Sequence, residues 1–272
     1  MEKKKGIPHF ICEKAPVIGM LLACLAFLIL LVIPEYYKNR GLGSNETYVY
    51  LVDIAVSILF MFLYKLWFSP AYKGSIKASV SGKEIMRILI PVLVYTIVNI
   101  IILFAQGTLV FEPTVAKLVQ ALNAGFFEET LFRVTMIPIA LHFMKSEKKV
   151  TLAWLIPTII FGAAHLGNLV GGGALSVIIA QAIATAFFGI YFAALFMCTG
   201  SIIVPIAVHA VWDFICFSCD GKLDNGIMVQ QSIDLGLFAE CATNIVIGIL
   251  AVMIISRNKE KILRIWDEKW SG

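Results

Sequence analysis

Long apolar segments separated by short polar ones run through most of the chain. A helix needs about 20 largely apolar residues to cross a bilayer, and eight segments approach or exceed that length. The segment 201–217 is short, and 114–142 is long enough to tilt or to begin at the membrane interface. The pattern predicts an all-α fold, a polytopic integral membrane helix bundle of about eight transmembrane helices. Their predicted ranges are 16–33, 48–67, 88–110, 114–142, 151–168, 174–197, 201–217 and 235–256.

Composition agrees with this pattern and adds an orientation. The 272 residues are 60% hydrophobic and only 15% charged, which is far from the balance of a soluble domain. Of the 22 lysines and arginines, sixteen fall on one side of the predicted membrane and four on the other, so we expect both termini in the cytoplasm. The net charge of +4 then follows from topology and indicates no nucleic-acid partner. No repeat or long linker divides the chain, which predicts a single integral membrane domain over 1–272.

Several ionisable residues interrupt the apolar segments. Glu128, Glu129 and Arg133 lie in the middle of 114–142, and His165, His209 and Asp213 lie in later segments. Such groups are costly at membrane depth, so they face the bundle interior, find partners and usually mark function.

Helical spacing predicts how these groups pair. Residues four apart share a helix face, so Glu129 and Arg133 can form an ion pair, and His209 shares a stripe with Asp213. Glu128 points about 100° away from Glu129 and is left for chemistry.

Two kinds of chemistry fit these residues. A glutamate in an apolar cavity is suited to take a proton from water and return it to a leaving amine, with histidine sharing that task. Alternatively Glu128, His165, His209 and Asp213 offer nitrogen and oxygen ligands acceptable to one divalent metal, Zn²⁺. The residues alone support either mechanism, with no cofactor or with one metal ion.

Three motifs in order resemble a known family. Glu-Glu-x-x-x-Arg at 128–133, Phe-x-x-x-His at Phe161 and His165, and His-x-x-x-Asp at 209–213 are similar to the motifs of the CAAX-processing and bacteriocin-processing (CPBP) intramembrane proteases. That family includes the type II CAAX prenyl endopeptidase. The motif-bearing core spans 120–217, and the eight predicted helices fit the family.

The resemblance implies roles for the motif residues. Glu128 and His165 would activate water, His209 and Asp213 would line the oxyanion region, and Glu129, Arg133 and Phe161 would support them. Members are commonly labelled metalloproteases, although a glutamate mechanism without metal has also been argued. The last position is often asparagine, and an ionised Asp213 would repel an oxyanion unless protonated, turned away or bound to metal.

The expected function is therefore intramembrane hydrolysis of a peptide bond. The partners would be the lipid bilayer and a peptide or protein substrate, membrane-associated substrates included, and composition favours a bacterial plasma membrane. Peptide maturation, bacteriocin processing and self-immunity are the roles that the resemblance suggests. A non-catalytic membrane scaffold or immunity protein, and a proton-coupled transporter, are the alternatives.

Overall fold

The computed structural model describes residues 6–37, 46–169, 174–221, 223–224, 227–228 and 232–271. Among these residues the regular structure is helical, apart from one pair of two-residue antiparallel strands and one isolated bridge. The elements are α1 Ile7–Lys14, α2 Pro16–Tyr37, α3 Glu46–Phe68, α4 Gly82–Gln106, α5 Val115–Glu129, a π-helical turn Thr130–Val134, α6 Ile137–Phe143, α7 Lys149–Ala164, a 3-10 helix His165–Leu169, α8 Leu175–Thr199, α9 Ile203–Cys219, β1 Leu223–Asp224, β2 Ile227–Met228, α10 Leu235–Arg257 and α11 Lys259–Trp270.

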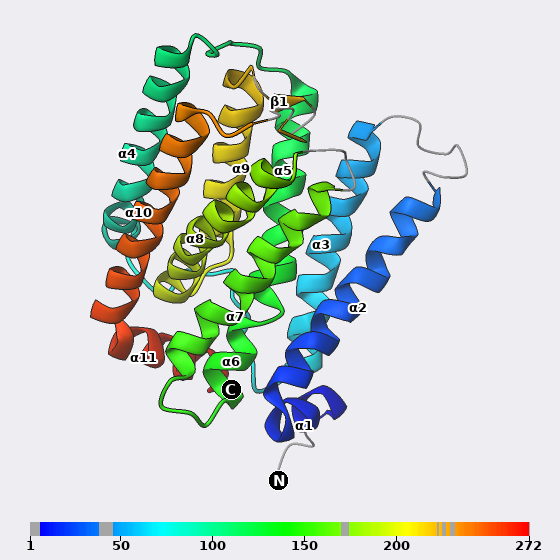
Figure 1. Cartoon of the computed structure of the whole chain (residues 1–272). Coiled ribbons are helices and arrows are strands. Elements are labelled where there is room, and N and C mark those ends of the chain that lie inside the picture. Colours follow the sequence, from blue (N-terminus) through cyan, green and yellow to red (C-terminus); the bar gives the residue numbers. More distant parts are fainter. Residues whose placement is uncertain are drawn as a thin grey trace.

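Helices occupy all eight predicted ranges. Within the part of the chain that the structure describes, five helices are long and apolar enough to cross a membrane, namely α3, α4, α8, α10 and the α7 segment extended to Leu169. Shorter apolar helices cover Pro16–Val32 and Ile203–Cys219. Both ends of the chain lie at the same end of the bundle (Figure 1), as an even number of crossings requires. The count of eight spans and the cytoplasmic location of the termini stay predictions.

The segment predicted as one helix over 114–142 is broken, so this part of the prediction is wrong. Helix α5 ends at Glu129, the next turn is π-helical, and α6 begins only at Ile137. The Thr135 amide bonds the Thr130 carbonyl five residues back at 3.3 Å. Pro138, in the first turn of α6, has no N–H to continue the preceding ladder. The break directly follows the two glutamates, and π-helical turns often occur at functional sites.

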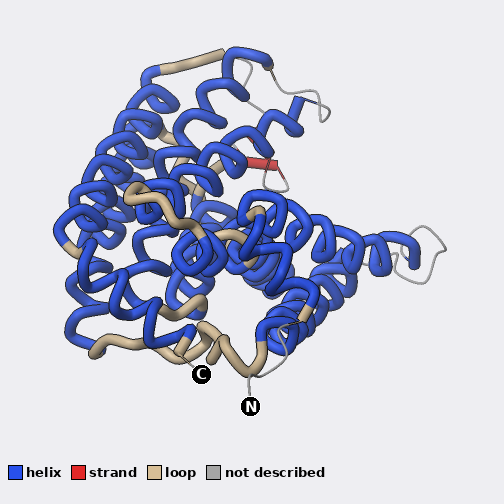
Figure 2. Tube along the Cα trace, turned by 90° about the horizontal axis from the view of Figure 1, so that it is seen from below, coloured by secondary structure: helices blue, strands red, loops and turns tan. Residues whose placement is uncertain are grey.

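Helix α8 forms the centre of the bundle. Every side chain from Phe188 to Thr199 is buried, and α7, α9, α10 and α11 all pack against this helix. Helix α5 packs between α9 and α3, while α4 lies against α10 at the far side (Figure 1). Seen along the bundle, α2 and α3 project from the rest of the molecule (Figure 2). The motif-bearing helices α5, α7 and α9 therefore meet with α8 in the interior.

Glycines allow these helices to approach closely. A Cβ at Gly125 of α5 would lie 2.8 Å from the carbonyl oxygen of Ile206 on α9. A Cβ at Gly162 of α7 would lie 2.7 Å from the Ala182 carbonyl oxygen on α8. Small residues of this kind are common where membrane helices pack backbone to backbone. Because Gly125 is one turn before Glu128 and Glu129, it sets the distance between the glutamates and α9.

Two amphipathic helices were not expected from the apolar pattern. Helix α1 precedes the first long helix, and α11 follows the last. Trp266 of α11 is 1% exposed and donates its indole N–H to the Met197 carbonyl at 3.0 Å. Lys269, also buried, donates to the carbonyls of Gly74 and Lys77 at 3.3 and 3.0 Å. Helix α11 therefore closes the end of the bundle that carries both termini.

Candidate active site

Glu129 and Arg133 form the ion pair that their spacing predicts. Glu129 Oε1 lies 3.1 Å from Arg133 Nη1, and both side chains are almost completely buried. Arg133 also donates through Nη2 to the Gly189 carbonyl at 3.2 Å, and its guanidinium lies 4.4 Å from the centre of the Phe161 ring. A Cβ at Gly189 would collide with Phe161 at 2.7 Å, so only glycine leaves room for this stack. Arg133 thus ties the π-helical turn to α7 and α8.

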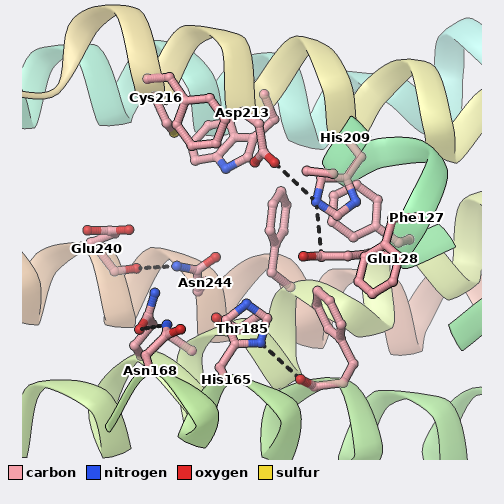
Figure 3. A pocket seen from close by; sticks show the side chains of 18 of the residues that line it. Phe127, Glu128, His165, Asn168, Thr185, His209, Asp213, Cys216, Glu240 and Asn244 are labelled. Atoms are coloured by element: carbon pink, nitrogen blue, oxygen red, sulfur yellow. Dashed lines mark hydrogen bonds and ion pairs between the residues drawn. The ribbon is translucent and has the colours of Figure 1, made fainter. Parts of the chain in front are cut away.

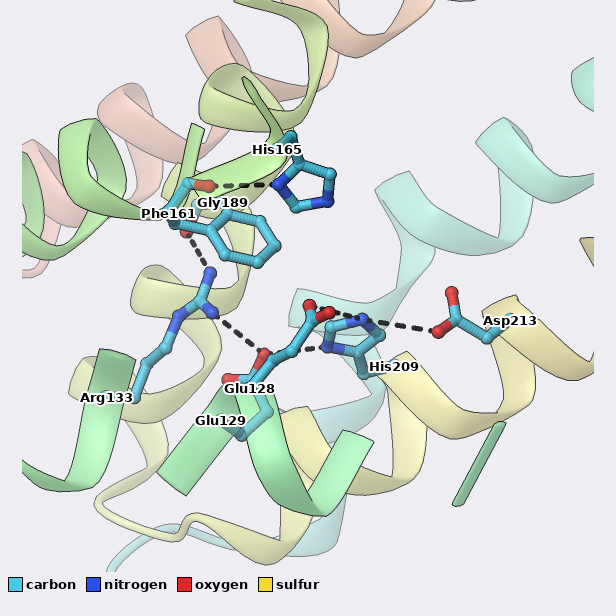
Figure 4. A network of polar contacts seen from close by, with 8 residues as sticks. All are labelled: Glu128, Glu129, Arg133, Phe161, His165, Gly189, His209 and Asp213. Atoms are coloured by element: carbon cyan, nitrogen blue, oxygen red, sulfur yellow. Dashed lines mark hydrogen bonds and ion pairs between the residues drawn. The ribbon is translucent and has the colours of Figure 1, made fainter. Parts of the chain in front are cut away.

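His209 lies among three carboxylates (Figure 4). Its Nδ1 is 2.9 Å from Glu129 Oε1, while Nε2 is 3.4 Å from Glu128 Oε2 and 3.6 Å from Asp213 Oδ2. Phe192 stacks on the imidazole with ring centres 4.5 Å apart, and the side chain is buried. Both ring nitrogens face oxygen acceptors, the arrangement that an imidazolium satisfies because both of its nitrogens donate.

His165 faces the same space from a different element. It is the first residue of the 3-10 helix, just past the end of α7, instead of lying within a continuous helix over 151–168. Its Nδ1 is 2.9 Å from the Phe161 carbonyl oxygen. A carbonyl only accepts, so Nδ1 donates, and in the neutral ring Nε2 is left as an acceptor for a proton or a water.

A cavity of about 370 Å³ joins these groups. Its walls include the four residues predicted to be catalytic, Glu128, His165, His209 and Asp213. Glu128, His209 and Asp213 lie on one side of it, and His165 on the other (Figure 3). Phe161 also contributes to the wall, whereas Glu129 and Arg133 lie behind it. The structure therefore brings all seven predicted site residues together, five of them lining the cavity and two, Glu129 and Arg133, beside it.

Sequence analysis missed several uncharged polar residues of the cavity wall. Tyr95 donates to Asn244 Oδ1 at 2.9 Å, and Asn168 donates to Gln181 Oε1 at 3.0 Å. Asn123 of α5 lines the same space. A signal for them exists in the sequence, because amides inside apolar helices need hydrogen-bond partners across the bundle.

The spacing of the candidate ligands bears on whether the site could hold a metal ion. Among the described residues, no three His, Cys, Asp or Glu side chains are arranged to hold a metal ion. The predicted set of Glu128, His165, His209 and Asp213 therefore does not form a zinc site in this arrangement.

The net charge of the cluster around His209 is small, with Glu240, a further carboxyl residue of the cavity wall, not counted. With all groups ionised, three carboxylates face Arg133 and an imidazolium His209, which leaves one net negative charge. One carboxyl proton, on Glu128 or Asp213, would bring the group to neutrality. A buried cluster that can gain or lose one proton at little electrostatic cost is suited to general acid–base catalysis.

Comparison with known families agrees with the motifs. Residues 110–215 match the family model described as type II CAAX prenyl endopeptidase Rce1-like. No curated protein and no solved structure matches the chain significantly. The matched segment contains every predicted site residue, runs from the approach to α5 through most of α9, and indicates a membrane endopeptidase of the CAAX protease type. Over residues 110–215 the chain is thus similar to the type II CAAX prenyl endopeptidase Rce1-like family, and the resemblance indicated by its motifs is confirmed.

Proposed function

We propose that the chain is an intramembrane endopeptidase in which Glu128 is the general base that activates water. The observation that carries the proposal is that Glu128 lines the same cavity as His165, His209 and Asp213. Its Oε2 lies 3.4 Å from His209 Nε2, so a carboxylate and a charge-stabilising donor flank the same space.

The proposed reaction is a hydrolysis in which every proton is accounted for. Glu128 takes a proton from water, and the oxygen attacks the carbonyl carbon of the peptide bond. His165, with Nε2 as acceptor, orients that water from across the cavity. When the C–N bond breaks, the proton returns from Glu128 to the leaving amine. The products are a carboxyl and an amino terminus, and the enzyme is regenerated.

His209 is the proposed oxyanion stabiliser. Its Nε2 faces Glu128 and Asp213 at 3.4 and 3.6 Å, which are longer than ordinary charged hydrogen bonds. That N–H is weakly held, so a developing oxyanion can compete for it. Glu129 holds the other nitrogen at 2.9 Å and so fixes the orientation of the ring. Asp213 contributes least repulsion to the oxyanion when it carries the site's extra proton.

The function is tested by quantitative N-terminal proteomics of cells that carry the wild-type protein or Glu128→Ala at matched abundance. New protein N-termini that are present with wild type and absent with Glu128→Ala would establish proteolysis and reveal the cleaved sequence. Indistinguishable sets of termini would contradict the proposal and favour a non-catalytic scaffold or immunity protein, or a transporter. The same experiment tests the proposed roles in peptide maturation or bacteriocin processing, because it identifies the substrates.

A further inference from the structure

Carboxamide side chains form a second feature of the cavity wall beside the ionisable groups. Asn123 comes from α5, Asn168 from the 3-10 helix and Gln181 from α8. Neither the motifs nor the proposed water activation uses them. Among the residues that the structure describes, no lysine or arginine lines the cavity. These amides are therefore uncharged donors and acceptors that a bound substrate peptide can use.

Asn168 and Gln181 form one hydrogen-bonded pair. Asn168 Nδ2 donates to Gln181 Oε1 at 3.0 Å. This bond leaves the Asn168 carbonyl oxygen as an acceptor and the Gln181 amino group as a donor, side by side. A peptide group offers the complementary N–H and C=O. The pair therefore presents one acceptor and one donor, as the exposed edge of a β-strand does.

The position of Asn168 follows from the 3-10 helix. Residues three apart in such a helix lie on the same face, so Asn168 follows His165 along the cavity wall. With a rise of about 2 Å per residue, the separation along the axis is about 6 Å. An extended peptide advances about 3.3 Å per residue. Asn168 would then contact a peptide group about two residues from the bond that His165 approaches.

Asn123 supplies a second acceptor on another wall. Its Oδ1 is buried and has no hydrogen-bond partner in the described part of the chain. A buried polar atom of this kind calls for an explanation such as a ligand or an ordered water. Asn123 is five residues before Glu128 on α5, which is about 7.5 Å along the helix axis. It therefore lies on the Glu128 side of the cavity, whereas Asn168 lies on the His165 side.

We propose that Asn123, Asn168 and Gln181 bind the main chain of an extended peptide segment next to the bond that is cut. The inference rests on the proposed function and deepens it. Substrate N–H groups donate to Asn168 Oδ1 and, once the Asn123 side chain turns its amide oxygen toward the cavity, to Asn123 Oδ1, and Gln181 Nε2 donates to a substrate carbonyl. These contacts involve backbone groups only, so they select an extended, unfolded segment of any sequence over a helical one, whose backbone groups are already bonded.

The test uses the full-length protein in lipid nanodiscs and a synthetic peptide that spans a Glu128-dependent cleavage site. In a set of analogues, each backbone N–H flanking that site is replaced in turn by an ester oxygen. The variants are Asn123→Ala and Asn168→Ala. Asn99→Ala is the matched control, because Asn99 is buried on α4 and does not line the cavity. Values of KM and kcat are measured for every pair of enzyme and peptide.

The expected result is that Asn168→Ala raises KM about 3- to 10-fold, the value of one hydrogen bond, while Asn99→Ala leaves KM unchanged. One ester analogue should raise KM by a similar factor for wild type and have no further effect in Asn168→Ala. Asn123→Ala should cancel the effect of a different ester position. A merely structural role would lower kcat and thermal stability without cancelling any ester effect.

Two other outcomes overturn the inference and can be told apart. If Glu128→Ala abolishes cleavage but every ester analogue affects wild type, Asn123→Ala and Asn168→Ala equally, the amides do not bind the backbone and the proposed function stands. If no Glu128-dependent cleavage occurs, the proposed function fails and the inference fails with it.

Discussion

Replacing Glu129 by glutamine should destabilise the protein far more than the same replacement at an exposed ion pair. Arg133 Nη1 and His209 Nδ1 contact the same oxygen of Glu129 at 3.1 and 2.9 Å, so the two nitrogens are at most about 6 Å apart. Without the carboxylate between them, two like charges at that distance repel by about 3 kcal/mol at an effective dielectric constant of 20. This agrees with the roughly 3–5 kcal/mol that breaking a buried pair costs.

The matched control is Glu84→Gln. Glu84 pairs with Lys261 near the start of α4, and its side chain is 40% exposed, whereas that of Glu129 is fully buried. Exposed pairs contribute little to stability. Both substitutions remove one carboxylate paired with a cation, so the comparison isolates burial.

Thermal unfolding in detergent can be followed with a thiol-reactive fluorophore, because Cys12, Cys24 and Cys198 are buried and free. We expect Glu129→Gln to lower the midpoint on the order of 10 °C, and Glu84→Gln to leave it nearly unchanged. Equal unfolding midpoints for the two variants would refute the reasoning, because they would show that the buried charge of Glu129 does not stabilise the protein.

Three further substitutions have defined outcomes. Gly189→Ala should reduce proteolytic activity at least tenfold, because the added Cβ would lie 2.7 Å from the Phe161 ring. The control Gly82→Ala should leave the activity unchanged in the same cleavage assay, because no atom lies within 4 Å of a Cβ at that position. Asp213→Asn should retain activity within about tenfold, because an amide donates toward an oxyanion and cannot repel it; a loss as large as that of a general base would show that the carboxyl itself is essential. Burial lowers the pKa of Lys269 to about 8. The folded state therefore binds fewer protons than the unfolded chain between about pH 8 and 10.5, so the unfolding midpoint should rise with pH across that window. Lys269→Met should abolish this rise, and an unchanged pH dependence would contradict the assignment.

Much of the site could be predicted because its parts are local. The Glu129–Arg133 pair and the shared stripe of His209 and Asp213 follow from helical spacing within one element. The convergence of Glu128 and His165 on one cavity was expected from the cost of ionisable groups in apolar segments.

Other parts depend on how elements pack, and spacing within one helix does not determine them. The π-helical turn after Glu129 interrupts the α-helix, and the spacing of apolar residues does not predict a single turn of this kind. The bond from Glu129 to His209 joins residues 80 positions apart and requires the close approach that Gly125 allows. Helix α11 is predominantly polar, so the pattern of apolar segments does not predict that its Trp266 is buried against the bundle.

The central claim is that Glu128 transfers the proton of the hydrolytic water. The most direct test uses purified Glu128→Gln, a substitution that keeps the shape of the side chain. Its rate of cleavage is measured on a peptide that spans a cleavage site identified by N-terminal proteomics. We predict that kcat falls about 10²- to 10⁴-fold with KM little changed, as loss of a general base requires, while Glu84→Gln retains the wild-type rate. A Glu128→Gln enzyme that keeps kcat within a few fold of wild type would contradict the account.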